Sequence, residues 1–304
     1  MSFMGNQYSI KNNGIIEVKS VMRKIPEIRL FVAACALIFF VHNAFGAPLP
    51  NDIIGKWQVE EVHLNTESGR TTEYTWDDPR LKGRIFDFTH DDVSDDVYDF
   101  SDHCANPTVQ NINTSLRDLM LRSLGGYKYP ASGDIDPVLD YKLDSASTKH
   151  IRAFSLICAK GLWQGDLGRS GGAGDKMNIS GAWIVLADNQ KMYVRWRDET
   201  ILVLTKISPD TPIKASFPCG KASTATEHAI CSSYQLSAFD QSVAESFARM
   251  MAQARVSGSQ TASLARSQRR WLEGRDACGP NAACILKAMR RRLDALATAG
   301  ANGE

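Results

Sequence analysis

The cysteines are the residues whose type and spacing most clearly predict chemistry in this chain. Six of the seven follow residue 46, and an even number in an exported chain favours three disulfides over free thiols. These six are Cys104, Cys158, Cys219, Cys231, Cys278 and Cys284. The last four can pair in three ways, and the sequence alone does not choose between them, although local pairing (Cys219–Cys231 and Cys278–Cys284) is preferred. By elimination, Cys104 then pairs with Cys158.

The densest acidic run, HDDVSDDVYDFSDH from His90 to His103, carries groups that could bind a metal ion. Its carboxylate oxygens would suit calcium, and its histidines could serve zinc. However, the run lacks the spacing of an EF-hand loop and the glycine that such a loop requires. No other spacing of histidines and carboxylates supports a zinc site. We therefore expect no metal and no cofactor, and we interpret the run as a solvated, irregular acidic edge.

The sequence shows no recognisable arrangement for catalysis. The glycine-rich segment LGRSGGAGDK (Leu167–Lys176) does not match the Walker pattern and no helix signal follows it, which indicates a surface loop. A Gly-x-Ser-x-Gly elbow is absent from the sequence. Carboxylates are plentiful, but nothing selects two of them as a glycosidase pair. We therefore expect no enzyme, with an envelope hydrolase as the less favoured alternative.

The beginning of the chain has the layout of a secretory signal peptide. From Met22 it has a basic start, an unbroken apolar run from Leu30 to Val41, and small residues before a cleavage point after Gly46. The run is too short to span a bilayer, so no stable membrane insertion is expected after cleavage, and an uncleaved anchor is the alternative. Residues 1–21 have no place in such a peptide, which indicates an over-called start. The mature protein is expected to be periplasmic or secreted.

The segment VAAC that ends at Cys35 resembles a lipoprotein cleavage box. Apolar residues continue for six positions past Cys35, whereas a lipidated protein would normally begin with a polar linker. The pattern therefore disfavours lipidation, and use of a lipid anchor at Cys35 stays open.

Charge divides the mature chain into two segments of opposite sign. Residues 47–210 hold 18 Lys and Arg against 25 Asp and Glu, a net charge of −7. Residues 211–304 hold 12 against 7, a net charge of +5. Pro209, Pro212 and Pro218 mark the joint between them. The pattern predicts an acidic domain over 47–210 and a separate module over 211–304.

The acidic segment has the short, partly alternating runs that are typical of β-strands. The runs cover residues 53–64, 83–90, 138–143 and 151–158. The clearest run, residues 181–207, divides at 188–189 and 197–198 into three strands of an antiparallel meander. Residues 113–124 form the one good helix candidate, with Thr114 or Ser115 as its cap. We predict a strand-rich antiparallel barrel or sandwich with one helix. Gly55-Lys56-Trp57 resembles the Gly-x-Trp that opens lipocalin-like barrels, although such a Trp is usually core.

The C-terminal segment has a helical pattern. Thr224 and Glu227 make a capping box, which starts a helix that runs to about Arg255 with a break at 234–237. A second helix carries Leu264 to Arg275, and a third follows Cys284. Three short helices bury little apolar area, so covalent staples are expected. The whole chain is therefore expected to be α+β: the strand-rich domain, then a small disulfide-stapled three-helix module.

The order of motifs in this module resembles the lysozyme-inhibitor LprI-like family, small exported helical domains of bacteria. The shared pattern runs Cys, Ala-Ile-Cys, Leu-x-x-x-Asp, Gln-x-x-Trp-Leu, Arg-Asp-x-Cys and Cys, over residues 217–296. The family-matched positions are Asp240, Gln268, Trp271 and Arg275, which we interpret as structural. Met289 departs from the aromatic residue that the family commonly has there. The resemblance does not cover the acidic domain.

The resemblance implies a protein partner, lysozyme, and an inhibitory function. Such an inhibitor needs no catalytic group, because it would occlude the cleft that holds the enzyme's two carboxylates with a basic or hydrogen-bonding loop. Near the first disulfide the candidate contacts are Lys221, Glu227 and His228. Many host lysozymes are strongly basic, so we expect the acidic domain to steer such a target electrostatically.

Other functions fit the same sequence. The strand-rich domain could hold a small ligand or an envelope component inside its barrel, with the helices as a docking tail. The basic run Arg290-Arg291-Arg292 is interpreted as the solvated face of a helix, and no nucleic-acid partner is expected.

Overall fold

The computed structural model describes residues 46–65, 71–97, 102–125, 127, 135–144, 151–163, 182–258 and 261–301. Residues from Gly46 onward form one compact unit. Apart from Gly46, the expected signal peptide lies outside the described residues, and so does the segment Leu167–Lys176. None of the described helices combines the length and the apolar composition that a membrane span requires.

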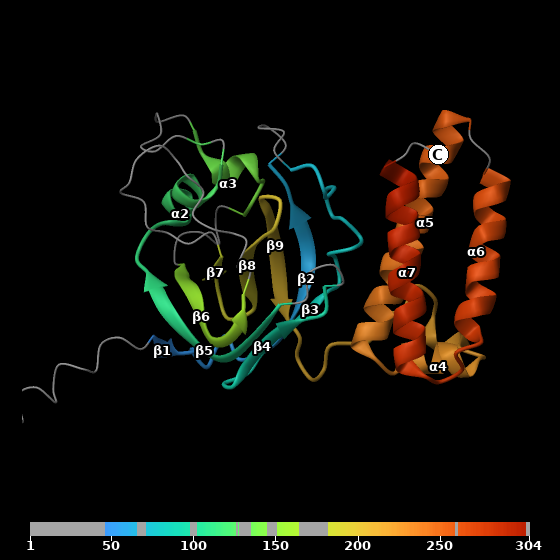
Figure 1. Cartoon of the computed structure of the whole chain (residues 1–304), viewed down its shortest axis with the longest axis horizontal. Coiled ribbons are helices and arrows are strands. Elements are labelled where there is room, and N and C mark those ends of the chain that lie inside the picture. The colour runs from blue at the N-terminus through green and yellow to red at the C-terminus, as the bar shows by residue number, and fades with distance from the viewer. Residues whose placement is uncertain are drawn as a thin grey trace, which may run out of the picture. The chain divides into compact units, whose positions relative to one another are not determined.

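The acidic segment folds into an antiparallel barrel, which confirms the barrel alternative of the expected fold (Figure 1). The strands in chain order are β1 (Ala47–Pro48), β2 (Gly55–His63), β3 (Ile85–Phe88), β4 (Asp92–Asp95), β5 (His103–Ile112), β6 (Arg152–Leu162), β7 (Trp183–Leu186), β8 (Lys191–Trp196) and β9 (Thr200–Lys206). Their order in the sheet is β1-β5-β4-β3-β2-β9-β8-β7-β6, and β5 also pairs with β6. Eight strands therefore close on themselves, while β1 pairs with β5 beyond the end of β4.

Large aromatic side chains fill the inside of the barrel. Trp57, Phe86 and Trp196 are fully buried, and the rings of Phe86 and Trp196 meet edge to face with centroids 5.5 Å apart. Trp163 packs on Phe86 in the same manner, at 5.9 Å. Edge-to-face pairs of this kind add to the free energy gained by burying aromatic area. The Trp of the Gly-x-Trp motif is thus a core residue. These side chains belong to one buried apolar cluster inside the barrel.

A second apolar core lies between the barrel wall and two short helices. Helix α2 (Leu116–Ser123) begins at Ser115, whose side chain accepts a hydrogen bond from the Asp118 amide, and this confirms the predicted helix. Its buried face packs with residues of β7, β8 and β9 that point out of the barrel. The same core includes Val138 and Tyr141. One face of the meander over 181–207 is therefore covered, and the three predicted strands of that meander are confirmed.

The strand predicted over 138–143 is wrong, because α3 (Pro137–Asp140) begins there. The Asp136 side chain accepts a hydrogen bond from the Val138 amide at 3.0 Å, and Pro137 occupies the first turn. Proline has a backbone angle suited to a helix start and lacks only a donor that would be unpaired there. The alternation of apolar residues after Pro137 had favoured a strand, and the cap overrides it.

The described part of the acidic run, residues 90–97, 102 and 103, is not an irregular edge. Its residues 92–95 form β4, which pairs with β3 on one side and β5 on the other, and Val93 is fully buried inside the barrel. Asp96 and Asp102 are also buried. This strand was not predicted, because three of its four residues are polar and Val93 is its one apolar residue.

The disulfide between Cys104 and Cys158 lies where β5 and β6 close the barrel, with the two Cα atoms 5.0 Å apart. Opposite Cys104 stands Gly161, which has a φ of +84°. A Cβ atom at Gly161 would collide with the carbonyl oxygen of His103, so the close approach of the strands requires glycine. The covalent link and the close approach both hold the closing pair of strands in register.

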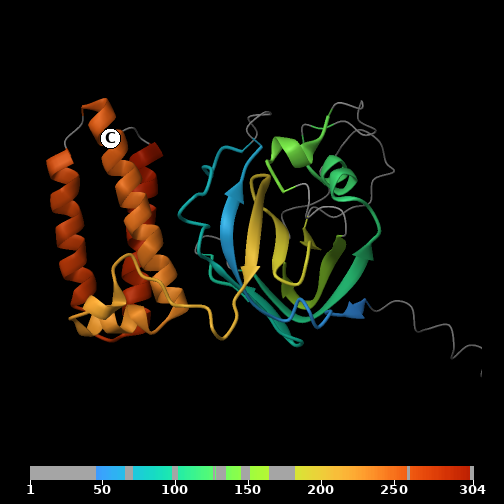
Figure 2. The same cartoon turned by 180° about the vertical axis from the view of Figure 1, so that it is seen from behind.

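The C-terminal segment contains a 3-10 turn and four α-helices: η2 (Cys219–Lys221), α4 (Ala225–Cys231), α5 (Tyr234–Ser257), α6 (Thr261–Asp276) and α7 (Ala282–Ala301). The first predicted helix is divided at Ser233, which caps α5 by accepting from the Leu236 amide, so the break comes slightly earlier than predicted. Gly258 ends α5 with a φ of +70°. Figure 2 shows α5, α6 and α7 side by side, with α4 across one end. The module is otherwise the stapled helical unit that the sequence predicts.

Candidate partner-binding surface

The two disulfide loops of the helical module lie together at one end of it. We call this surface the stapled end; it comprises residues 219–231 and 278–284, closed by Cys219–Cys231 and Cys278–Cys284. Thr226, fully buried between the loops, donates from Oγ1 to the carbonyl oxygens of Asp276 (3.2 Å) and Gly279 (2.9 Å). The two loops therefore form one cross-linked surface, and the preferred local pairing of the cysteines is the one present.

Lys221 and His228 project from the stapled end. Lys221 closes the 3-10 turn that follows Cys219, and His228 lies in the last turn of α4; both are exposed. Each is held by backbone that a disulfide fixes, so the two side chains are presented by a rigid surface. Both can carry positive charge and donate hydrogen bonds.

Glu227 has a different role from the other two candidates. Its carboxylate accepts hydrogen bonds from the amides of Ser223 (2.7 Å) and Thr224 (3.0 Å), and the Thr224 side chain accepts from the Glu227 amide in return. These backbone hydrogen bonds lower the pKa of Glu227. The structure thus shows the predicted capping box, and the carboxylate is used to begin α4.

A buried ion pair joins the helices behind the stapled end. The Arg275 Nη1 donates to the Asp240 Oδ1 at 3.1 Å, and both side chains are almost fully buried. The second Asp240 oxygen accepts from the Ser216 amide at 2.7 Å, and Arg275 also donates to Asp276. The guanidinium of Arg275 lies over the ring of Trp271, 5.4 Å from its centroid. These family-matched side chains connect α5, α6 and the segment that enters the module.

The run of three arginines on α7 is not a solvated face. Arg292 is buried and donates to Gln268 (2.9 Å) and Ser267 (3.1 Å) on α6. Arg290 points toward the barrel, where it donates to the Asp96 carbonyl at 3.4 Å and lies over the Phe239 ring. Arg291 alone of the three is exposed. The interpretation of this run as solvated is therefore wrong for two of its three residues.

Arg84 of the barrel is buried against α5. Its Nη2 donates to the Ser242 Oγ at 2.9 Å, and the guanidinium lies over the Phe239 ring. Its Nε and Nη1 have no hydrogen-bond partner among the described residues, so the ring face takes the place of a polar partner. Asp96 supplies the nearest attractive charge and accepts a hydrogen bond from Gln235 at 3.1 Å. The barrel and the helices therefore meet at a buried polar contact.

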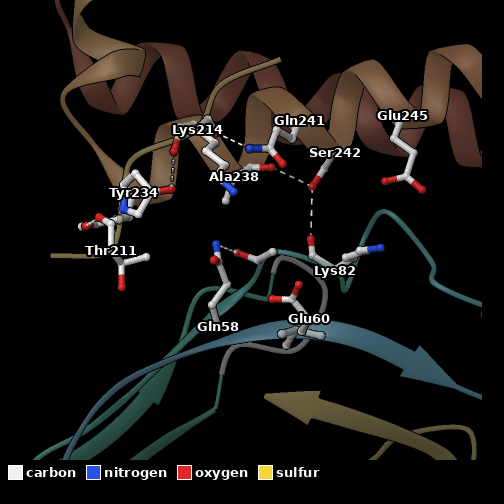
Figure 3. Close-up of a pocket in the computed structure, with 14 residues that line it drawn as sticks. Gln58, Glu60, Lys82, Thr211, Lys214, Tyr234, Ala238, Gln241, Ser242 and Glu245 are labelled. Atoms are coloured by element: carbon white, nitrogen blue, oxygen red, sulfur yellow. Dashed lines mark hydrogen bonds between the residues drawn. The ribbon is translucent and has the colours of Figure 1, made fainter. Parts of the chain in front are cut away.

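A cleft of about 270 Å³ follows the same junction (Figure 3). Most of the polar groups that line it bond to one another across the seam or along its wall. Ser242 donates to the Lys82 carbonyl, Gln58 donates to the Gly83 carbonyl, and Gln241 donates to the Lys214 carbonyl. The Ser242 bond holds the barrel loop against α5, whereas each of the other two lies within one of the two parts. The cleft is thus a seam between two packed parts.

Asp95 and Asp96 of the acidic run line part of a second cavity, of about 430 Å³, between β3, β4 and the start of α5. Burial, together with the charges of Asp96 and Asp102, raises the pKa of Asp95 to about 8. The Asp95 oxygens accept from the amides of Val97 (2.9 Å) and Asp102 (3.1 Å). Within the described residues, no three His, Cys, Asp or Glu side chains are grouped so as to hold a metal ion.

Sequence reasoning found the stapled end but missed the junction. Cysteine spacing and a capping motif mark Lys221 and His228 directly, because both features are local. Nothing in the sequence around Arg84 indicates that a cation there enters the helical module. Its position directly before an apolar strand was the one available signal, since a charged residue so placed must find a buried partner.

Comparison with known proteins covers the helical module alone. No curated protein and no solved structure matches the chain. Residues 219–296, which include the stapled end, the Asp240–Arg275 pair and Trp271, match the family described as Lysozyme inhibitor LprI.

Proposed function

We propose that this is an exported protein that binds a lysozyme-type enzyme and occludes its cleft with the stapled end of the helical module. The match of residues 219–296 to the lysozyme-inhibitor family carries the proposal. Two observations support export. The residues up to Gly46 have the layout of a signal peptide. The three disulfides of the remaining chain are of the kind that form in an oxidising compartment.

The stapled end suits this task physically. Two disulfides and the Thr226 hydrogen bonds fix its shape, so little conformational entropy is lost when it binds. Lys221 offers positive charge, and His228 a hydrogen-bonding side chain, to a cleft that holds two catalytic carboxylates. Occlusion requires complementary shape and charge, and no reacting group.

The acidic barrel supplies the second part of the proposal. A basic enzyme is repelled by the +5 charge of residues 211–304 and attracted by the −7 charge of residues 47–210. Exposed barrel carboxylates such as Glu60 and Asp91 would raise the rate of encounter with a cationic target.

The direct test is lysis of a bacterial suspension by lysozyme, with micromolar amounts of the chain from Ala47 onward added at low salt. The unmodified protein is expected to slow lysis. A Lys221→Glu/His228→Glu variant is expected to lose inhibition by at least about tenfold, because it places negative charge against an acidic cleft. The matched control is Arg255→Glu/Arg266→Gln, which gives the same change in net charge with His228 counted as neutral, at exposed positions outside the stapled end.

The outcomes separate the function from the surface. No protection by the unmodified protein would remove the proposed function. Protection that is equal for the unmodified protein and the stapled-end variant would keep the function and move the contact elsewhere. Loss of protection in the control variant alone would assign the contact to the long helices.

A further inference from the structure

Five exposed cations on α6 and α7 form a basic face that the proposed function does not use. They are Arg266, Arg269, Arg270, Lys287 and Arg291. None of the five makes an ion pair with an acid in the described part of the chain. Glu273 is the one acidic residue among the exposed positions of α6. Positive charge thus predominates on this surface.

The five cations lie at the same level along the two helices. Arg266, Arg269 and Arg270 are three and four residues apart and share the outer side of α6, and Lys287 and Arg291 are four apart on α7. Contacts between the helices set their alignment: the Trp271 Nε1 donates to the Ala288 carbonyl, and Arg292 donates to Gln268. Residues 266–271 of α6 therefore lie beside residues 288–292 of α7.

The barrel does not cover this face in the described structure. The polar contacts with the barrel come from α5 and α7, through the side chains of Gln235, Ser242, Arg249 and Arg290. Arg290 and Arg291 are adjacent on α7, so their side chains project in directions about 100° apart, and Arg291 is exposed where Arg290 contacts the barrel. The main packing neighbours of α6 are α4, α5 and α7.

We propose that this basic face adsorbs the protein to a phospholipid bilayer that carries anionic headgroups. We infer the class of partner from the positive charge of the basic face and from the side chains that lie beside the five cations. The other uncharged exposed positions of α6, Ala262, Ser263 and Gly274, are small or polar, so this face of α6 has no large apolar side chain to insert between lipid tails. It also lacks an exposed aromatic ring on which a nucleic-acid base could stack. The attachment is therefore electrostatic, peripheral and reversed by salt.

Adsorption through α6 and α7 would have a consequence for the rest of the molecule. Residues 47–210 carry a net charge of −7 and are repelled by the same surface. The protein would therefore bind with its helices toward the lipid. This inference does not depend on a lysozyme-type partner, and it is tested without one.

The test is co-sedimentation of the chain from Ala47 onward with lipid vesicles at low salt. Vesicles of phosphatidylcholine with about one third phosphatidylglycerol are compared with phosphatidylcholine alone. The protein is expected to sediment with the anionic vesicles and to be released by about 0.5 M salt. Arg266→Gln/Arg269→Gln/Arg270→Gln is expected to weaken the apparent affinity on the order of 100-fold, from three lost charges. Glutamine retains helix propensity, and circular dichroism verifies that the variant is folded.

The matched control removes three exposed cations outside the basic face, Lys56→Gln/Lys160→Gln/Lys214→Gln. It is expected to bind the anionic vesicles as the unmodified protein does. The proposal would be overturned if the unmodified protein bound neutral and anionic vesicles equally. It would also be overturned if the α6 variant bound anionic vesicles with the affinity of the unmodified protein. Inorganic polyphosphate in solution is the last arm: binding to it without binding to vesicles would also overturn the assignment to a bilayer.

Discussion

The guanidinium carbon of Arg84 lies 3.3 Å from the ring centroid of Phe239, so that a fully buried cation of the barrel rests on the face of α5. Burial lowers the pKa of Arg84 to about 10, with the attraction of Asp96 acting in the opposite direction. The side chain therefore stays charged at neutral pH. The ring and the Ser242 hydroxyl replace the water that it loses. Neither the barrel nor the helical module can offer this surface to a partner.

Arg84→Ala is expected to lower the free energy of unfolding by about 3 kcal/mol. The change leaves a cavity against Phe239 and removes the cation that faces Asp96. Arg84→Met should destabilise less, because an apolar chain of similar length fills the cavity and needs no polar partners. Urea unfolding followed by tryptophan fluorescence measures both. Equal stability of Arg84→Ala and the unmodified protein would show that this contact does not hold the barrel to α5.

Asp95 is expected to make stability depend on pH. The unfolded side chain has its ordinary pKa near 3.8, whereas the folded value is about 8. Between these values the native state retains a proton that the unfolded state has lost. The contribution of Asp95 to stability is therefore greatest below about pH 4, falls by a few kcal/mol toward pH 8, and then levels off. The groups nearest to Asp95 are Asp96 and Asp102, and Asp102 also faces Arg197.

Asp95→Asn tests this assignment, because asparagine stays neutral and keeps one of the two oxygens that accept from the Val97 and Asp102 amides. The variant is expected to be more stable than the unmodified protein at pH 8 and to lose most of the slope between pH 4 and pH 8. Urea unfolding at several pH values measures the slope. The same slope in both proteins would assign the titration to another group.

How much the sequence could predict depends on whether a signal was local. The meander of β7, β8 and β9 has turn residues at 188–189 and 197–198, and the capping box has both of its partners within four residues. These features were predicted. β5 was not, because it contains Pro107, a residue that argues against a central strand, and because its apolar residues are few. Its place depends on pairing with β6, 39 residues further along.

The junction was beyond prediction for a related reason. Arg84 and Ser242 are 158 residues apart, and neither has neighbours that indicate burial in a second part of the chain. The run Arg290-Arg291-Arg292 shows the same limit. Helical spacing turns the three side chains in different directions, but it does not identify which direction meets Asp96 and which meets Gln268.

The three disulfides are expected to differ in their contribution to stability. Cys104–Cys158 closes 54 residues and Cys278–Cys284 closes 6. On the chain-entropy estimate, replacing the first pair by serine should cost about 4 kcal/mol and replacing the second about 2 kcal/mol. Thermal unfolding of the two double variants gives the order. A larger loss for Cys278 and Cys284 would mean that local geometry at the stapled end outweighs loop entropy.

Asp240→Asn is expected to destabilise the helical module by about 3 kcal/mol. The change leaves Arg275 buried with Asp276 as its remaining carboxylate and weakens the bond from the Ser216 amide. A double-mutant cycle with Arg275→Gln should show that the two changes are not additive, because each removes the same ion pair. Glu273→Gln, an exposed change in the same module, serves as the control and should be neutral. Additive losses would show that Asp240 and Arg275 act separately.

Electrostatic steering by the barrel predicts a salt dependence that is confined to the association rate. If a basic lysozyme-type enzyme binds, its association rate should fall at least tenfold between about 0.02 M and about 0.3 M salt, because screening shortens the range of the barrel's field. The dissociation rate should change little, since it reports contacts already formed. Surface plasmon resonance separates the two rates.

Glu60→Gln/Glu73→Gln/Asp91→Gln removes three exposed carboxylates of the barrel and leaves the stapled end intact. Association at low salt should slow severalfold, and the variant and the unmodified protein should converge at high salt, where both fields are screened. The Lys221→Glu/His228→Glu variant should instead raise the dissociation rate, because it changes the docked contact. A barrel variant whose rates match those of the unmodified protein at every salt concentration would leave the acidic domain without a part in the encounter. The opposite net charges of residues 47–210 and 211–304 would then need another explanation.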